Sequence, residues 1–170
     1  TPLYSSAASD VYKRQDITLG SSLTVSGPIT VRGGNITVNA NLNTSGGNAA
    51  GDVLLKATGS ITLGTNRTIT TSGGDVVVWA DSDANSVGRI VFTANTVNTH
   101  TLVTNGGHIY LGGGAGANDL PSGAAHGGSN IGISLNDGTS TWTSATSTFD
   151  TRKSGAPAGN VTISGLSTGD

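Results

Sequence analysis

One short pattern recurs along this chain: a glycine, then Asn, Asp or His, then a run of aliphatic residues. Within each run, aliphatic residues tend to alternate with Thr or another residue, as expected for a half-buried β-strand. A turn followed by a strand, repeated along one chain, is typical of a solenoid. The copies are Gly34-Asn35-Ile36-Thr37-Val38, Gly51-Asp52-Val53-Leu54-Leu55, Gly74-Asp75-Val76-Val77-Val78, Gly107-His108-Ile109-Tyr110-Leu111 and Gly159-Asn160-Val161-Thr162-Ile163.

The composition favours strands and turns over helices. The chain has 27 glycines, no Glu and only 11% charged residues, whereas Thr, Ser, Asn, Val and Ile are abundant. The absence of Cys excludes disulfides and thiolate metal sites. A net charge of −2 provides no basic surface for nucleic acid, and no apolar run is long enough to predict a membrane-spanning helix.

Residues 1–15 differ from the rest of the chain. The segment Asp10-Val11-Tyr12-Lys13-Arg14-Gln15 matches the translation of a transposon adapter used in DNA sequencing. We therefore interpret residues 1–15 as an unstructured adapter artefact and exclude them from the fold prediction. It follows that we expect the natural chain to be a fragment of a longer protein.

The spacing of the strands predicts the architecture. The strand starts that follow the recurring glycine, Ile36, Val53, Val76, Ile109 and Val161, lie 17, 23, 33 and 52 residues apart. Between them, Gly-x-Ile recurs as a second strand and a Thr-rich stretch as a third. We predict an all-β fold, a right-handed parallel β-helix with three strands per coil. The alternative is a β-sandwich.

We expect one domain over residues 16–170, with loop excursions near 112–130 and 136–159. The first range is rich in Gly and Ala without alternation, and the second contains an Asn-Asp-Gly turn and a Thr/Ser-rich stretch. Because these irregular ranges precede Gly159, its copy of the pattern is interpreted as a distant echo of the coil starts.

The segment Thr71-Ser72-Gly73-Gly74-Asp75-Val76-Val77-Val78-Trp79-Ala80-Asp81, followed by Gly88-Arg89-Ile90 and Thr104-Asn105-Gly106-Gly107-His108-Ile109, resembles the repeat region of filamentous-haemagglutinin-like exoproteins. This resemblance covers residues 16–111 well and the remainder loosely. It implies a right-handed β-helix and a secreted or surface-displayed bacterial protein, often an adhesin. No segment matches the secretion-signal module of that family.

The best candidate for a metal site is Asp81-Ser82-Asp83-Ala84-Asn85. Oxygen ligands at alternate positions, Asp81, Asp83 and Asn85, are suited to Ca²⁺. However, Ser86 stands where such a loop needs Gly, and Phe92 where it needs a bidentate Glu. The alternative is a polar corner loop.

No residues are predicted to be catalytic, and no cofactor is expected. The chain lacks a Ser-His-Asp or Cys-His signature, and its three histidines lack metal-ligand spacing. Asp52 and Asp75 occupy equivalent slots of adjacent coils, as clustered acids of a polysaccharide-acting β-helix enzyme would. Because Asn35 and His108 occupy the same slot, a role in turning the corner explains Asp52 and Asp75 better than catalysis does.

Strand alternation predicts an outward-facing apolar stripe. If Val76 and Val78 point inward, then Leu54, Val77, Trp79 and Tyr110 lie together on the outer surface. We expect this stripe to dock a glycan, a protein partner or a neighbouring part of the parent protein. The alternative is that a loop, such as residues 112–130, covers it.

The favoured function is a structural or adhesive stalk segment of a large secreted or cell-surface bacterial protein, without catalysis. It would stack on the rest of the parent solenoid and present its faces to a host or neighbouring cell. Two alternatives remain: a fragment of a polysaccharide lyase or hydrolase, and a calcium-stabilised repeat module.

Overall fold

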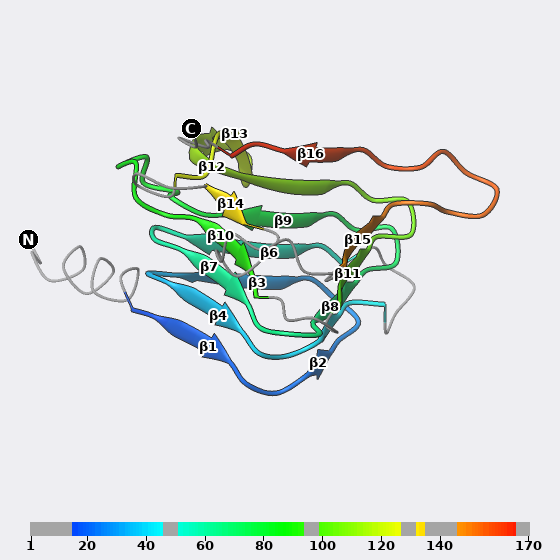
Figure 1. Cartoon of the computed structure of the whole chain (residues 1–170). Helices are drawn as coiled ribbons and strands as arrows, with labels where there is room; N and C mark the ends of the chain where they lie inside the picture. The colour runs from blue at the N-terminus through cyan, green and yellow to red at the C-terminus, as the bar shows by residue number, and fades with distance from the viewer. Residues whose placement is uncertain (1–14, 46–50, 94–98, 127–131, 135–145, 166–170) are drawn as a thin grey trace, which may run out of the picture.

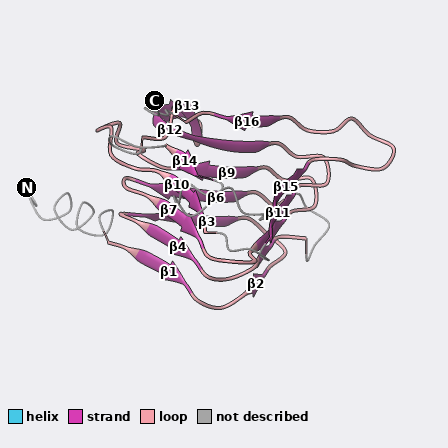
Figure 2. Cartoon of the chain, viewed as in Figure 1, coloured by secondary structure: helices cyan, strands magenta, loops and turns pink. Residues whose placement is uncertain are grey.

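The computed structural model describes residues 15–45, 51–93, 99–126, 132–134 and 146–165. All regular structure in these ranges is β-strand, and Figure 2 shows no helix among them. The strands form three sheets, which we name A, B and C.

Each sheet takes one strand from each successive coil. Sheet A contains β1 (Ile17–Leu19), β4 (Ile36–Val38), β7 (Ile61–Leu63), β10 (Ile90–Phe92) and β14 (Ile133–Ser134). Sheet B contains β2 (Leu23–Thr24), β5 (Leu42–Asn43), β8 (Thr68–Thr70), β11 (Thr99–Val103) and β15 (Thr146–Asp150). Sheet C contains β3 (Ile29–Gly33), β6 (Val53–Ala57), β9 (Val76–Trp79), β12 (Ile109–Ala117) and β16 (Val161–Ile163), with β13 (Leu120–Gly123) folded back on β12.

The strands within each sheet run parallel, and their coils stack along one axis (Figure 1). Only the β12–β13 pair among the named strands is antiparallel. This arrangement confirms the expected parallel β-helix with three strands per coil. It excludes the β-sandwich, which is built from antiparallel sheets.

The core is formed by columns of aliphatic side chains that stack from coil to coil. The first residue of every strand in sheet A is isoleucine, and these five isoleucines are in register: Ile17, Ile36, Ile61, Ile90 and Ile133. Ile36, Ile61 and Ile90 are at most 1% exposed. Each fully buried aliphatic side chain contributes about 1.5–3 kcal/mol, so these columns provide the main stabilisation of the stack.

The recurring glycine pattern marks two corners rather than one, which corrects the predicted coil starts. Ile36 lies in sheet A, not in sheet C with the strands that follow the other copies. Ile29, Val53, Val76, Ile109 and Val161 form the sheet C column, so successive coils advance by 24, 23, 33 and 52 residues. Val161 is therefore a true coil position, because it pairs in register with Ile109 despite the long connection before it.

The two ranges expected to be loop excursions also contain strands. In 112–130, β12 continues to Ala117 and pairs with β13 as a hairpin, whose turn residues Asn118 and Asp119 both have positive φ, 55° and 57°. A two-residue turn with φ > 0 at both positions suits the twist of a hairpin. In 136–159, β15 pairs with β11 and completes sheet B. Its Thr-rich sequence favours a pleated surface, so the strand forms without clear aliphatic alternation.

Candidate functional site

The corner that precedes sheet C carries a column of hydrogen bonds, which we name the corner ladder. Its members are Asp52, Asp75, His108 and Asn160. Oδ1 of Asp52 accepts the backbone N–H of Asp75 at 2.8 Å, and Oδ1 of Asp75 accepts that of His108 at 2.7 Å. Nδ1 of His108 accepts the N–H of Asn160 at 2.9 Å. The side chains of Asp52, Asp75 and His108 thus each bind the backbone of the next coil, so the slot requires an acceptor as well as a residue that tolerates a turn.

The corner that precedes sheet A uses the same device. Oδ1 of Asp16 accepts the N–H of Asn35, and Oδ1 of Asn35 accepts that of Ser60, both at 2.8 Å. Oγ of Ser60 then accepts the N–H of Arg89 at 3.2 Å. Backbone N–H groups at a corner have no strand partner, and these side chains satisfy them.

Buried threonines close the sheet C corner from inside. Their hydroxyls donate to the carbonyl of the glycine that precedes each ladder residue, at 2.5–2.8 Å. The pairs are Thr44 with Gly51, Thr71 with Gly74, Thr104 with Gly107, and Thr151 with Gly159. The segments Thr71-Ser72-Gly73-Gly74 and Thr104-Asn105-Gly106-Gly107 are therefore hydrogen-bonded corners. Thr44 keeps this role although residues 45–50 separate it from Gly51.

Removing one acceptor of the corner ladder is expected to destabilise the fold. Asp75→Ala leaves the N–H of His108 without its partner, and we expect a loss of about 1–3 kcal/mol in the free energy of unfolding. Asp75→Asn keeps an acceptor oxygen, as Asn35 does in the other corner, and should cost much less. Urea unfolding of the two variants tests this expectation, and equal losses would contradict the role of the ladder.

The apolar stripe does not form an exposed surface. Leu54, Val77 and Trp79 are 6%, 5% and 1% exposed, and Tyr110 is half-buried against them. They do lie together on the outer side of sheet C, as the alternation predicted. The β12–β13 hairpin covers them, and Leu120 of that hairpin packs on the cluster. Part of the range anticipated as the alternative cover, residues 112–123, thus forms a hairpin.

Polar contacts fix the hairpin on this surface. The indole Nε1 of Trp79 donates to the carbonyl of Gly114 in the hairpin at 2.7 Å. The Lys56 ammonium lies 3.6 Å from the ring centre of the same indole. Nη2 of Arg32 pairs with Oδ1 of Asp119 at 2.8 Å, which ties the hairpin turn to the first coil. Partial burial, followed by the nearby charge of Arg32, lowers the pKa of Lys56.

The calcium candidates Asp81, Asp83 and Asn85 are joined by hydrogen bonds within their own loop. Asp81 is 1% exposed, and its Oδ1 accepts the N–H groups of Asn85 and Val87 at 3.0 and 3.4 Å. Asp83 and Asn85 are exposed and hydrogen-bond to each other at 3.0 Å. The loop is therefore closed by Asp81 in the manner of a polar corner. Within the described ranges, no group of three or more His, Cys, Asp or Glu side chains is placed to hold a metal ion. Calcium binding remains a prediction.

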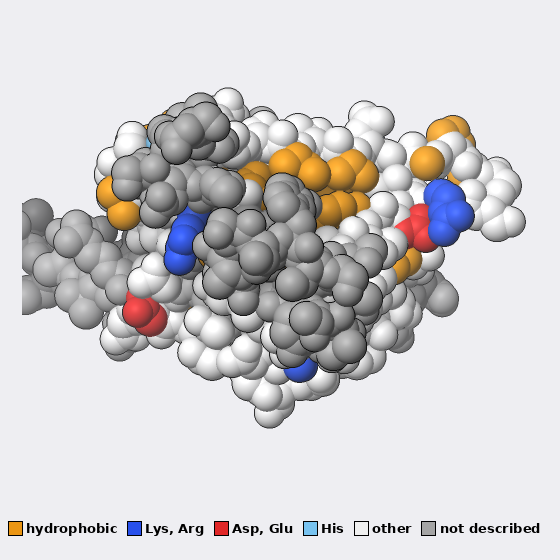
Figure 3. Space-filling view, viewed as in Figure 1, with side chains coloured by type: hydrophobic (Ala, Val, Ile, Leu, Met, Phe, Trp, Pro, Cys, Tyr) orange, Lys and Arg blue, Asp and Glu red, His pale blue; other side chains and the backbone are white. Residues whose placement is uncertain are grey.

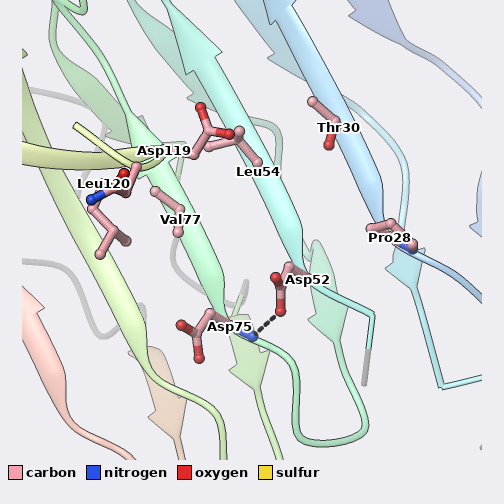
Figure 4. A pocket seen from close by; sticks show the side chains of 9 residues that line it. Pro28, Thr30, Asp52, Leu54, Asp75, Val77, Asp119 and Leu120 are labelled. Atoms are coloured by element: carbon pink, nitrogen blue, oxygen red, sulfur yellow. Dashed lines mark hydrogen bonds between the residues drawn. The ribbon is translucent and has the colours of Figure 1, made fainter. Parts of the chain in front are cut away.

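A groove lies beside the hairpin turn on the outer face of sheet C (Figure 4). It has a volume of about 200 Å³. Its floor is formed by Leu54 and Val77, and the corner residues Asp52 and Asp75 lie at one end. The remaining lining residues are Pro28, Thr30, Asn118, Asp119 and Leu120. The groove could not be predicted from the sequence, because only the fold brings the hairpin turn over strands that precede it by dozens of residues.

His100 is buried against the ring of Phe92. It is 1% exposed, its ring is 5.4 Å from Phe92, and its Nε2 bonds the carbonyl of Thr93 at 2.7 Å. Its Nδ1 and the Oγ of Ser147, its register partner on β15, are both buried without a hydrogen bond to the described residues. Burial lowers the pKa of His100, with a smaller contribution from Arg67, so the neutral imidazole is favoured.

This lowered pKa predicts acid sensitivity. The unfolded chain, in which His100 has its ordinary pKa of 6.5, binds a proton more readily than the folded chain. The contribution of His100 is therefore complete above this value and falls as the pH drops through it toward the folded pKa. We expect His100→Gln to remove this part of the pH dependence in unfolding titrations. Identical pH profiles for the two proteins would contradict the assignment.

No known protein family, curated protein or solved structure shows detectable similarity to this chain. Among the described residues, there is no helix with the length and apolar character needed to cross a membrane.

Proposed function

We propose that this chain is a structural segment of a longer solenoid, the stalk of a secreted or cell-surface bacterial adhesin. The observation that supports this proposal is the exposure of inward-facing residues at both ends of the stack. Val161 and Ile163 of β16 are 42% and 49% exposed, whereas their register partners Ile109 and Leu111 are at most 1% exposed. A further coil stacked on β16 would bury them.

The opposite end has the same character. Leu23 of β2 is 41% exposed, whereas its register partner Leu42 is 1% exposed. Figure 3 views the stack from the side and shows hydrophobic side chains gathered in the half of the stack that contains β16. Repeat proteins normally need polar caps at their ends, so two apolar ends favour an internal segment.

Adding one coil tests the structural part of the proposal. Residues after Ile163 would be replaced by a copy of residues 56–78, which follow the equivalent position of the second coil. We expect the extended chain to gain about 1 kcal/mol or more in the free energy of unfolding, since Val161 and Ile163 become buried. A scrambled extension of the same composition is the control. Equal stability of the two extended chains would contradict an open stack.

The surface location needs a separate test. Antibodies raised against the described segment are expected to label intact cells of the organism that encodes it, without permeabilisation. The resemblance to filamentous-haemagglutinin-like exoproteins motivates this expectation. Labelling that appears only after permeabilisation would contradict a secreted or outer-surface protein.

A polysaccharide-acting enzyme is the second candidate, and one observation favours it: Asp52, Asp75 and Asp119 line a single groove. However, Asp119 pairs with Arg32, and Asp52 and Asp75 each use one oxygen in the corner ladder. These roles explain the three carboxylates without catalysis. Release of reducing ends or unsaturated products from polyuronides, lost in Asp75→Asn, would establish the enzyme instead.

A further inference from the structure

The groove beside the hairpin turn combines an apolar floor with an acidic rim. Leu54 and Val77 form the floor, and Pro28 and Leu120 add apolar walls. Three of the nine lining residues are aspartates, and none is Lys or Arg. Figure 4 shows Asp52 and Asp75 at the starts of neighbouring strands, and Asp119 across the floor from them.

The acidic rim retains acceptor capacity after its internal bonds are made. The bonds that the structure gives Asp52 and Asp75 within the ladder are accepted by Oδ1, and none is made by Oδ2 to the described residues. Asp119 pairs through Oδ1 with Arg32, the one cation bonded to the three aspartates in the described part of the chain. A ligand that brings positive charge and several N–H donors therefore complements this rim.

The size of the groove restricts the ligand. Sites for small molecules typically enclose about 300–1,000 Å³, which exceeds the 200 Å³ found here. One long side chain is a better match, with its methylene stem on the apolar floor and its charged head at the rim. Asp52 and Asp75 lie at the starts of neighbouring strands, and each contributes one carboxylate. Two separate carboxylates suit the diverging donors of an ammonium better than the planar fork of a guanidinium, which prefers one carboxylate in bidentate contact.

We propose that this groove binds a lysine side chain presented by a protein partner. The alkyl stem packs on Leu54 and Val77, and the ammonium is held by Asp52 and Asp75 at one end of the floor. This inference is independent of the stalk role, because it depends on the outer face of sheet C and not on the ends of the stack.

The test uses two capped tripeptides, Gly-Lys-Gly and Gly-norleucine-Gly, titrated into the isotopically labelled full chain at low salt. Norleucine keeps the alkyl stem and lacks the ammonium. We expect the lysine peptide to shift the backbone amide signals of Leu54, Val77 and Leu120, and the norleucine peptide to bind at least tenfold more weakly. Equal shifts with both peptides, or no shifts at these amides, would overturn the proposal.

Matched variants separate the groove from general electrostatic attraction. Asp52→Asn and Asp75→Asn remove charge but keep the ladder acceptor, so both proteins should fold, and unfolding curves verify this. We expect each to weaken the lysine peptide about two- to fivefold, as for an exposed ion pair. Asp16→Asn is the control, because it removes the same charge from the other corner. An equal loss in Asp16→Asn would overturn the assignment to the groove.

Discussion

Gly74→Ala is expected to destabilise the protein by about 3 kcal/mol or more, the upper part of the range for overpacking a tight interior. A Cβ at this position would lie closer than 3.0 Å to the carbonyl oxygen and carbon of Gly51 and the amide nitrogen of Asp52, one coil below. These are backbone atoms of a packed corner, so they cannot move aside as a flexible side chain would. Urea unfolding followed by circular dichroism measures the loss.

The same constraint recurs along the sheet C corner. A Cβ on Gly51, Gly107 or Gly159 would also approach the carbonyl of the glycine one coil below within 3.0 Å. Gly20→Ala is the matched control, because nothing lies within 4 Å of the position of its Cβ. If Gly74→Ala and Gly20→Ala cost the same, the destabilisation would arise from glycine content in general and not from close stacking at the corner.

Trp79→Ala is expected to cost about 3–5 kcal/mol and to release the hairpin from sheet C. The mutation removes a side chain that is 1% exposed, the contact with Leu54 and Val77, and the hydrogen bond to Gly114. Gly116 also lies against the indole, since a Cβ there would be 2.7 Å from the ring. Chemical unfolding gives the loss of stability, and limited proteolysis within residues 113–123 reports the release.

Trp79→Phe is the control for this prediction. Phenylalanine retains most of the apolar contact and loses the indole N–H, so we expect a smaller loss and a hairpin that still resists proteolysis. Protection of the hairpin in Trp79→Ala equal to that in the unchanged protein would show that the ring does not anchor it.

The sequence predicted the coil stack because its strands are short and their inward residues are aliphatic. In Ile61-Thr62-Leu63 and Thr68-Ile69-Thr70, for example, aliphatic residues alternate with Thr, which is the pattern of a half-buried strand. It did not reveal which corner each glycine occupies. Gly34-Asn35 and Gly51-Asp52 have the same local chemistry, since both corners need an acceptor side chain, and only the register separates them.

Coverage of the apolar stripe was not predictable from local pattern. The hairpin that covers it contains Gly112, Gly113, Gly114 and Gly116, whose lack of side chains removes any alternation. Those glycines are needed because the hairpin lies close to other groups: a Cβ on Gly113 would meet the carbonyl of Ala80, and one on Gly116 would meet Trp79. The groove depends on the same long-range placement, because Asp119 reaches Arg32 across 87 positions of sequence.

The unequal lengths of the coils have a mechanical consequence. Hydrogen bonds between coils run along the stacking axis, so tension on the two ends of the chain should peel one coil at a time from an end. The sheet C register divides the chain into coils of 24, 23, 33 and 52 residues. At full extension these would release lengths of about 80, 80, 110 and 180 Å. A stalk built in this way would lengthen under load in discrete, unequal steps, and the coils with long insertions would absorb the greatest extension.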